Sequence, residues 1–376
     1  MPFFRDGKVA HFIRGFFLPE KHGIVFDQQT FPMKPLSVRK RLNYVLQGIR
    51  KHVNPLNAFG MPPVLQIEPV NYCNLRCRTC AFGAGLVRRP PVAMSFDLYR
   101  TIIDQVKDRV ILVALWAWGE PFLHDRACDM IRYAKDSGLF VHTSTNGHFF
   151  ETAEKAHRVI LSGLDSIILC IDGLDQETYE NYRVGGTLET VLRSTVNLVE
   201  EKKRLGRRNP RITLRFLVMK HNEHQVRALE SLALKLGVDT LSLRSPIARR
   251  DEIDLEEELV HVPPGQGVDL FKEKKTFLGK IGVSRRHCSR PYGNLTVFSN
   301  GDVVLCENDH SASLPLGNAS RDSLRRILSS DQARDRLALF RGNPGEIPFC
   351  RHCDERGYKG DRLNIQSRPV GKRSPR

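Results

Sequence analysis

The chain has 376 residues, nine cysteines and a formal net charge of +16. This length suits one large domain with a smaller one. The sequence contains no run of about eighteen apolar residues, so no membrane span is predicted. The N-terminal residues lack the cleavage site of a signal peptide. We therefore expect a cytoplasmic protein, in which clustered cysteines bind metals and do not form disulfides.

The excess positive charge is concentrated at the two ends of the chain. Residues 1–60 form a basic leader, in which residues 38–49 have the apolar spacing of an amphipathic helix. Residues 356–376 form a basic tail without apolar content, which predicts disorder. Such charge suits an anionic partner, for example an acidic substrate, a nucleic acid or a membrane surface, or it serves solubility alone.

Strands and helices alternate over residues 61–250. The predicted strands, rich in Val, Ile, Leu and Thr, are 64–70, 110–118, 139–145, 166–171, 211–219 and 240–244. The predicted helices include 96–107, 126–137, 187–205 and 223–236. Six such units predict an α/β domain with a parallel sheet, short of a closed eight-stranded barrel.

A cysteine motif follows the first predicted strand. Cys73, Cys77 and Cys80 have the spacing C-x3-C-x2-C. In strand–helix barrels, active sites lie at the C-terminal ends of the strands, where this motif falls. Three thiolates would hold three irons of a [4Fe–4S] cluster and leave one iron for another ligand. Zinc usually takes four protein ligands at a structural site, and spacing alone leaves both metals open.

Residues that could contact a ligand mark the ends of the next strands. They are Trp118-Gly119-Glu120, Asn146, Asp172 and the nearby Arg183. Each could belong to an ordinary turn. A side-chain amide offers both donors and acceptors, and a guanidinium can clamp a carboxylate. Cys170 shares a strand face with Asp172, so it is either a hydrogen donor to a substrate radical or a small core residue.

Residues 286–355 form a second, cysteine-bearing domain after a linker at 251–285. Strands at 295–298 and 303–305 flank an Asn-Gly turn, and a helix is predicted from Asp322 to Phe340. Four thiols, enough for a fully ligated [4Fe–4S] cluster or for zinc, come from Cys288, Cys306, Cys350 and Cys353. Cys128 falls within a predicted helix, and we expect it to be structural.

Three polar residues follow Cys306 in the sequence. Glu307, Asp309 and His310 could each act as a general base beside a metal centre, or simply form a polar loop.

Taken together, these motifs resemble the radical S-adenosylmethionine (radical SAM) superfamily over residues 64–355. The resemblance implies an open partial (β/α)6 barrel in which SAM binds the open iron of the [4Fe–4S] cluster held by the C-x3-C-x2-C motif. It places the methionine amino group of SAM at Trp118, Gly119 and Glu120, the ribose at Asn146 and Asp172, and the methionine carboxylate at Arg183. The sequence departs from the family pattern at Thr79, Trp118 and Cys170, where an aromatic residue, Gly and Ser are usual.

The C-terminal cysteines resemble the SPASM/Twitch-type domain, in the short version with one auxiliary [4Fe–4S] cluster. The resemblance implies SAM cleavage to a 5′-deoxyadenosyl radical that abstracts a substrate hydrogen. It also implies an external one-electron reductant of the flavodoxin or ferredoxin type. A fully ligated auxiliary cluster favours net oxidation of a small molecule or carbohydrate.

Two alternatives remain open. One is a peptide or protein maturase that makes a cross-link or an epimer. The other is a non-enzymatic protein that binds zinc and nucleic acid, which the SAM-contacting segments argue against.

Overall fold

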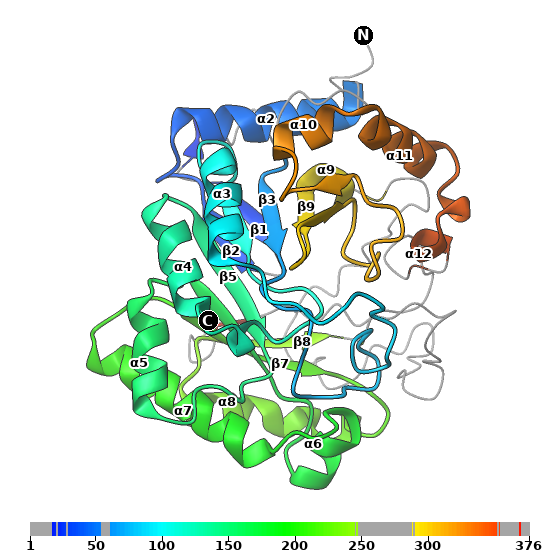
Figure 1. Cartoon of the computed structure of the whole chain (residues 1–376). Coiled ribbons are helices and arrows are strands. Elements are labelled where there is room, and N and C mark those ends of the chain that lie inside the picture. The colour runs from blue at the N-terminus through cyan, green and yellow to red at the C-terminus, as the bar shows by residue number, and fades with distance from the viewer. Residues whose placement is uncertain are drawn as a thin grey trace, which may run out of the picture. The chain divides into compact units, whose positions relative to one another are not determined.

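The computed structural model describes residues 17–19, 22–27, 29–53, 61–244, 246, 288, 290–351, 353 and 368–369 (Figure 1). The chain divides into two compact units. The first consists of Met1–Asn71, Arg88–His142 and Cys288–Arg351, and the second of Tyr72–Val87, Thr143–His287 and His352–Arg376. The predicted linker at 251–285 lies outside the described residues, as does the predicted tail apart from residues 368–369.

The first unit contains a sheet with the strand order β11-β10-β9-β3-β4-β5. The strands β3 (Val64–Ile67), β4 (Leu112–Ala114) and the start of β5 (Phe140–Thr145) are parallel. Every residue of β3 and β4 is buried, as their continuous apolar sequences predict.

The C-terminal hairpin extends this sheet. Its strands β9 (Asn294–Val297) and β10 (Asp302–Val304) pair antiparallel across the predicted turn, and β11 (Gly317–Asn318) follows at the edge. The turn residue Gly301 has φ +89°, a conformation that favours glycine. Strand β9 also pairs parallel with β3, a long-range contact that the sequence analysis did not anticipate.

Serine hydroxyls cap three helices of the first unit, α3 (Phe96–Val106), α10 (Leu324–Ser329) and α11 (Asp331–Gly342). Helix α3 packs against α4 (Ala127–Asp136), and the Ser95 hydroxyl caps α3. The single helix predicted from Asp322 to Phe340 is wrong, because two helices, α10 and α11, occupy this segment. Ser330 has an extended backbone, and its hydroxyl accepts a hydrogen bond from Ala333 N, so the chain restarts a helix there.

The rest of the C-terminal segment is short. Helix α9 (Arg290–Gly293) precedes β9, and α12 (Pro348–Arg351) carries Cys350.

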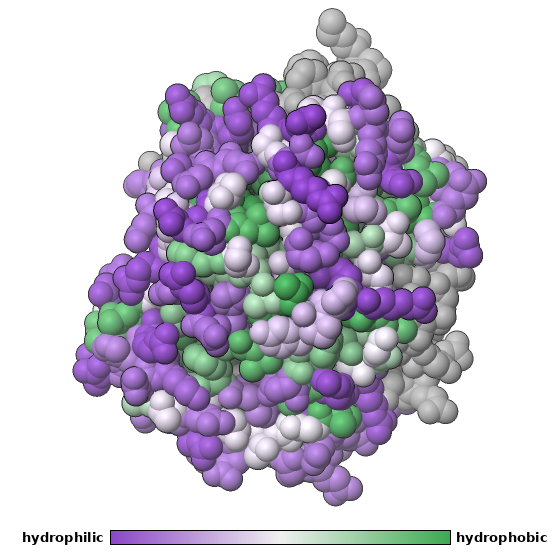
Figure 2. Space-filling model, viewed as in Figure 1, coloured by the Kyte–Doolittle hydropathy of each residue, from purple (hydrophilic) through white to green (hydrophobic). Residues whose placement is uncertain are grey.

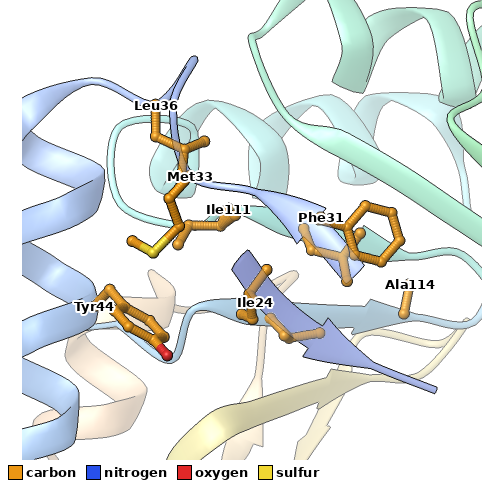
Figure 3. Packing of buried hydrophobic residues seen from close by; sticks show 9 residues of the cluster. Ile24, Phe31, Met33, Leu36, Tyr44, Ile111 and Ala114 are labelled. Atoms are coloured by element: carbon orange, nitrogen blue, oxygen red, sulfur yellow. The ribbon is translucent and has the colours of Figure 1, made fainter. Parts of the chain in front are cut away.

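The N-terminal part of the first unit contains a β-hairpin that sequence analysis missed. Strand β1 (Gly23–Phe26) pairs antiparallel with β2 (Gln29–Pro32), and α2 (Val38–Val53) follows where the apolar spacing predicts a helix. Side chains from these elements and from the region of β4 form one buried cluster (Figure 3): Ile24, Phe31, Met33, Leu36, Tyr44, Ile111 and Ala114. This part of the predicted leader therefore belongs to the core of the unit.

The second unit contains a sheet in which the end of β5 is followed by β6, β7, β8 and β12. Its strands are β6 (Ser166–Cys170), β7 (Arg211–Leu217), β8 (Thr240–Arg244) and the antiparallel β12 (Arg368–Pro369). The predicted strands 166–171, 211–219 and 240–244 are thus confirmed to within two residues.

Helices accompany these strands. Helix α7 (Leu188–Arg204) packs against both α5 (Ala153–Leu161) and α8 (Leu229–Leu236), as Figure 1 shows. Helices α5 and α6 (Gln176–Tyr182) were not expected from the sequence. The alternation of parallel strands and helices confirms the predicted α/β class.

Polar side chains predominate on the face shown in Figure 2, with apolar side chains in small groups between them. No helix in the described ranges is long and apolar enough to cross a membrane.

Lys40 of α2 has a pKa that burial in the first unit lowers. Its ammonium donates to the carbonyl oxygen of Gly138, 2.6 Å away, and burial lowers the pKa of Lys40 to about 8. Asp108 opposes this shift, and Lys135 adds to it. Between pH 8 and 10.5 the unfolded chain then binds more protons at this site than the folded protein, so stability rises with pH.

We expect the melting temperature of the native protein, relative to that of Lys40→Met, to increase between pH 7 and pH 9.5. Melting both proteins at the same scan rate at each pH measures this difference. A difference that is constant or falls with pH would contradict the lowered pKa.

Candidate active site

The three cysteines of the C-x3-C-x2-C motif lie together in the second unit. Cys77 is part of a buried cluster with Leu75, Tyr182 and Met219, and Cys73 and Cys80 pack against it. The loop folds closely on itself, since a Cβ atom at Gly83 would lie 2.2 Å from the Cys77 carbonyl oxygen. A glycine is therefore required there, and the thiols are brought together by a loop that tolerates no side chain at this position.

N–H groups point at two of the sulfur atoms. Cys73 Sγ accepts from Leu75 N at 3.4 Å and from Asn146 Nδ2 at 3.6 Å. Cys77 Sγ accepts from Arg183 Nη1 at 3.5 Å. Donors of this kind stabilise thiolates, which are the form of cysteine that binds iron. The donor set therefore fits a cluster held by Cys73, Cys77 and Cys80.

The surroundings of the Cys77 thiol favour its protonated form. Burial raises its pKa to about 11, and the Arg183 guanidinium only partly opposes that shift. A metal ion would have to displace this proton. Among the described residues, no three Cys, His, Asp or Glu side chains enclose a site for a metal ion.

Asn146, at the end of β5, is held in one orientation by His148. Its side-chain oxygen accepts from the backbone N–H of His148, and His148 Nδ1 lies 3.2 Å from the same oxygen. His148 Nε2 accepts from Thr187 N at 2.9 Å, so Nδ1 carries the ring proton. Asn146 Nδ2 is thereby directed at Cys73 and at Asn74 Oδ1, 2.8 Å away.

Asp172, just after β6, positions Arg183. One carboxylate oxygen lies 2.5 Å from Arg183 Nε, and the other accepts from Leu217 N at 2.6 Å. Asp172 has no exposed surface, so both oxygens are already engaged inside the protein. The structure therefore gives Asp172 an orienting role toward Arg183, and ribose binding by Asp172 stays a prediction.

Cys170 is the last residue of β6 and is 8% exposed. Its sulfur lies 3.6 Å from the Ser144 hydroxyl oxygen. This contact suits a packed core thiol as well as a reactive one, and its role as a hydrogen donor stays a prediction.

The predicted SAM-binding segment Trp118-Gly119-Glu120 lies in the first unit. Glu120 is 5% exposed and accepts from Phe122 N, so it caps the short helix that follows. Trp118 donates from its backbone N–H to Glu68 and from its indole Nε1 to the Glu307 carbonyl oxygen at 2.7 Å. The residue that replaces the usual Gly thus links this strand end to the loop after Cys306.

A buried ion pair supports the same loop. Arg89 makes two hydrogen bonds to the Glu68 carboxylate, at 2.6 and 2.8 Å, and its Nε donates to the His310 carbonyl oxygen. Glu68 also accepts from the backbone N–H and the hydroxyl of Ser299. The Arg89 guanidinium lies 3.8 Å from the centre of the Phe298 ring. The guanidinium thus donates three hydrogen bonds and lies against an aromatic ring, and a buried charge needs such compensation.

Three of the four C-terminal cysteines lie in the first unit, namely Cys288, Cys306 and Cys350, while Cys353 belongs to the second. None of the four is in a disulfide bond within the described part of the chain. The candidate bases after Cys306 differ in their contacts. Both Asp309 oxygens accept hydrogen bonds from residues 313–314 of its own loop, whereas Glu307 pairs with Arg290.

His310, the third candidate base, packs edge-on against Trp118, with ring centres 6.0 Å apart. The hydrogen bonds of Asp309 give it a structural role in the loop. Glu307 and His310 therefore remain the stronger candidates for a base.

Sequence reasoning missed the residues that orient the predicted ones. They are His148, which orients Asn146, and the pair Glu68 and Arg89, which contacts Trp118 and His310. His148 could have been suspected from its place two residues after Asn146. The Glu68–Arg89 pair had no signal in the sequence, since its partners are brought together by the packing of separate segments.

Two family models match the chain. The radical SAM superfamily model matches residues 67–233, and the SPASM model, an iron–sulfur cluster-binding domain, matches residues 288–354. Together they cover more than half of the chain. The first domain binds a [4Fe–4S] cluster and SAM, and the second binds an iron–sulfur cluster, as the resemblance implied.

Curated relatives are similar over different extents. Fe-coproporphyrin III synthase of Methanosarcina barkeri is 25% identical, over 69% of this chain and 64% of its own length. The tungsten-containing aldehyde ferredoxin oxidoreductase cofactor-modifying protein of Pyrococcus furiosus is 28% identical over 47% and 49%. The chain thus spans less than two thirds of both proteins. PqqA peptide cyclase of Streptomyces rochei is 23% identical over 80% and 83%.

Solved structures share the fold. Streptococcus suis SuiB bound to its precursor peptide SuiA has a TM-score of 0.60 and 15% identity, covering 93% of this chain and 83% of SuiB. BtrN in complex with AdoMet and 2-DOIA has a TM-score of 0.51 and 16% identity, covering 79% and 97%. This likeness confirms the predicted partial barrel with a C-terminal auxiliary domain. The chain therefore belongs to the radical SAM superfamily of enzymes, in the group that carries a SPASM domain.

Proposed function

We propose that this protein cleaves SAM reductively and uses the resulting 5′-deoxyadenosyl radical to remove a hydrogen atom from a substrate, with net oxidation of that substrate. The observation that carries the proposal is the arrangement in the second unit, where Asn146, at the end of β5, donates to the sulfur atom of Cys73, and Arg183, at the end of α6, donates to that of Cys77. When bound, a [4Fe–4S] cluster and SAM supply the radical chemistry.

The residues of the chain would hold and orient these groups. Cys73, Cys77 and Cys80 would ligate three irons. Arg183, already oriented by Asp172, presents a fixed guanidinium that suits the methionine carboxylate of SAM. The burial of Asp172 and Cys77 keeps water from this side of the site.

Net oxidation requires the substrate radical to lose one more electron and one proton. A fully ligated cluster on Cys288, Cys306, Cys350 and Cys353 would supply an acceptor for that electron. Glu307 and His310, directly after Cys306, are the candidate acceptors for the proton. The first electron, for SAM cleavage, would come from a flavodoxin- or ferredoxin-like protein in the cytoplasm.

The substrate class has two candidates. The electron-accepting arrangement suits dehydrogenation of a small molecule or carbohydrate. A peptide substrate is favoured by the two matches that cover most of this chain. PqqA peptide cyclase is similar in sequence over 80% of the chain, and peptide-bound SuiB is similar in fold over 93%. Both candidates require the same cleavage of SAM, so that step is tested first.

The decisive experiment is anaerobic reconstitution, followed by iron, sulfide and zinc analysis and an assay for 5′-deoxyadenosine with dithionite and SAM. About eight irons per chain, four for each cluster, together with SAM cleavage, would support the proposal. About four irons with one zinc would retain the radical enzyme but remove the electron acceptor. No iron and no cleavage would leave the zinc- and nucleic-acid-binding alternative.

Replacing both Cys350 and Cys353 by Ala distinguishes the role of the auxiliary cluster from that of the SAM-binding cluster. We expect SAM cleavage to continue, because the C-x3-C-x2-C ligands are intact, while about four irons are lost and oxidised product no longer forms. Iron analysis and the 5′-deoxyadenosine assay measure the first two effects without a known substrate. If this variant remains folded by circular dichroism but loses SAM cleavage, the two clusters do not have separate roles.

A further inference from the structure

The hydroxyl of Tyr179 is buried without a hydrogen-bond partner. The Tyr179 side chain has no exposed surface, and its Oη atom has no partner among the described residues. Burying a hydroxyl without a hydrogen bond costs free energy, and native proteins rarely leave one in this state. An unsatisfied hydroxyl in a ligand-binding region therefore points to a partner that the ligand supplies.

Tyr179 lies beside the proposed SAM site. It is on helix α6 four residues before Arg183, whose backbone N–H donates to the Tyr179 carbonyl oxygen. Residues at this spacing share one face of a helix. The Arg183 guanidinium on that face contacts Cys77 and Asp172.

The charged neighbours of the Tyr179 hydroxyl also place it beside the proposed SAM site. Burial raises the pKa of Tyr179, Arg183 lowers it, and Asp172, Cys77 and Cys170 raise it further. The charged and titratable neighbours of the hydroxyl are thus the same residues that define the site.

Glycines on two sides fit the backbone closely around Tyr179. A Cβ atom at Gly173 would lie 2.2 Å from the Tyr179 backbone nitrogen. A Cβ atom at Gly186 would lie 2.8 Å from Tyr179 Cε1 and 3.1 Å from its Oη. The ring therefore has little freedom to turn its hydroxyl toward another protein group.

The carboxylate oxygens of the neighbouring Asp172 already accept hydrogen bonds from other residues. Both oxygens of Asp172 accept from Arg183 and Leu217. Tyr182, on the same helix, shows the contrasting case, because its hydroxyl is satisfied by Thr79 at 2.8 Å. The described part of the chain supplies no acceptor for Tyr179, and a molecule that enters the site can supply one.

We infer that the Tyr179 hydroxyl donates a hydrogen bond to an oxygen atom of bound SAM. SAM offers a carboxylate and two ribose hydroxyls as acceptors. This inference rests on the proposed function, since it assigns one further binding residue to the same site. Tyr179 would then complete the site with Arg183, and the free energy of its unsatisfied hydroxyl would be recovered on binding.

The test compares Tyr179→Phe with a matched control, Tyr99→Phe. Tyr99 is also fully buried, but its hydroxyl donates to the Met130 carbonyl oxygen at 2.9 Å in the first unit. The dissociation constant of SAM is measured by anaerobic equilibrium dialysis on the reconstituted holoenzymes. The unfolding midpoint is measured on the same proteins without SAM.

Opposite effects are expected from the two variants. Tyr179→Phe should weaken SAM binding about five- to thirtyfold, as the loss of one hydrogen bond to a polar ligand does, without lowering the unfolding midpoint. Tyr99→Phe should lower the midpoint and leave SAM binding within about twofold. Decarboxylated SAM then identifies the acceptor: the effect of Tyr179→Phe disappears if the carboxylate accepts the bond and persists if a ribose hydroxyl does.

Unchanged SAM affinity in Tyr179→Phe would overturn the inference, as would a fall in the unfolding midpoint of the same size as in Tyr99→Phe. Failure of the native holoenzyme to bind SAM would overturn the proposed function itself. The two failures are distinguishable because the native protein is measured first.

Discussion

Alanine in place of Cys73, Cys77 and Cys80 should abolish SAM cleavage. These residues are the only thiols of the C-x3-C-x2-C motif, and without them three irons of the SAM-binding cluster have no protein ligand. Anaerobic reconstitution followed by the 5′-deoxyadenosine assay measures the loss. Iron should fall by about four per chain, and the cluster of the SPASM domain should remain.

Cys128→Ala is the matched control for this experiment. Cys128 lies on α4, in the first unit, and outside both cysteine sets. We expect it to retain the full iron content and cleavage of the native protein. SAM cleavage in the triple variant would refute the assignment of the motif, and so would an unchanged iron content.

Arg89→Met should be the most destabilising single substitution that we predict. The variant leaves the Glu68 carboxylate, which has no exposed side-chain surface, buried without its cation. Breaking a buried ion pair in this way costs about 3–5 kcal/mol. The His310 carbonyl oxygen also loses its donor, which should loosen the loop after Cys306. Denaturant unfolding of the anaerobic holoprotein measures the change.

Arg193→Met is the control for charge removal alone. Arg193 pairs with Glu189 on the surface of α7, with side chains 48% and 82% exposed, and the loss should stay within about 0.5 kcal/mol. The double variant Glu68→Gln with Arg89→Met removes the buried charge and should recover part of the stability. If Arg89→Met proves no more destabilising than Arg193→Met, the buried pair does not support the fold.

The chemistry-bearing residues were predictable because local sequence determines them. The spacing of Cys73, Cys77 and Cys80 follows from their place in one loop, and the polar residues Asn146 and Asp172 directly follow buried strands. Strand and helix positions were also local, because continuous apolar runs and helical spacing depend on neighbouring residues. The family match over residues 67–233 agrees with these inferences.

Sequence reasoning failed where structure depends on distant partners. The pairing of β9 with β3 joins segments far apart in the chain, for which periodicity carries no information. The hairpin β1–β2 is local and was missed because its four-residue strands are too short to establish a period. The break between α10 and α11 was readable in principle, since Ser330 is a favourable N-cap residue, but the apolar spacing continued across it.

The sequence by itself determined which groups are present: the two cysteine sets, Asn146, Asp172, Arg183 and the polar residues after Cys306. Only the tertiary structure decided which of these groups contact one another. In the folded chain, one oxygen of Asp172 orients Arg183 while the other accepts from Leu217 N, and Asn146 donates to Cys73. The Tyr179 hydroxyl has no hydrogen-bond partner among the described residues. Hydrogen bonds act over about 3 Å, a distance that only the packing of strands and helices from separate parts of the chain can determine.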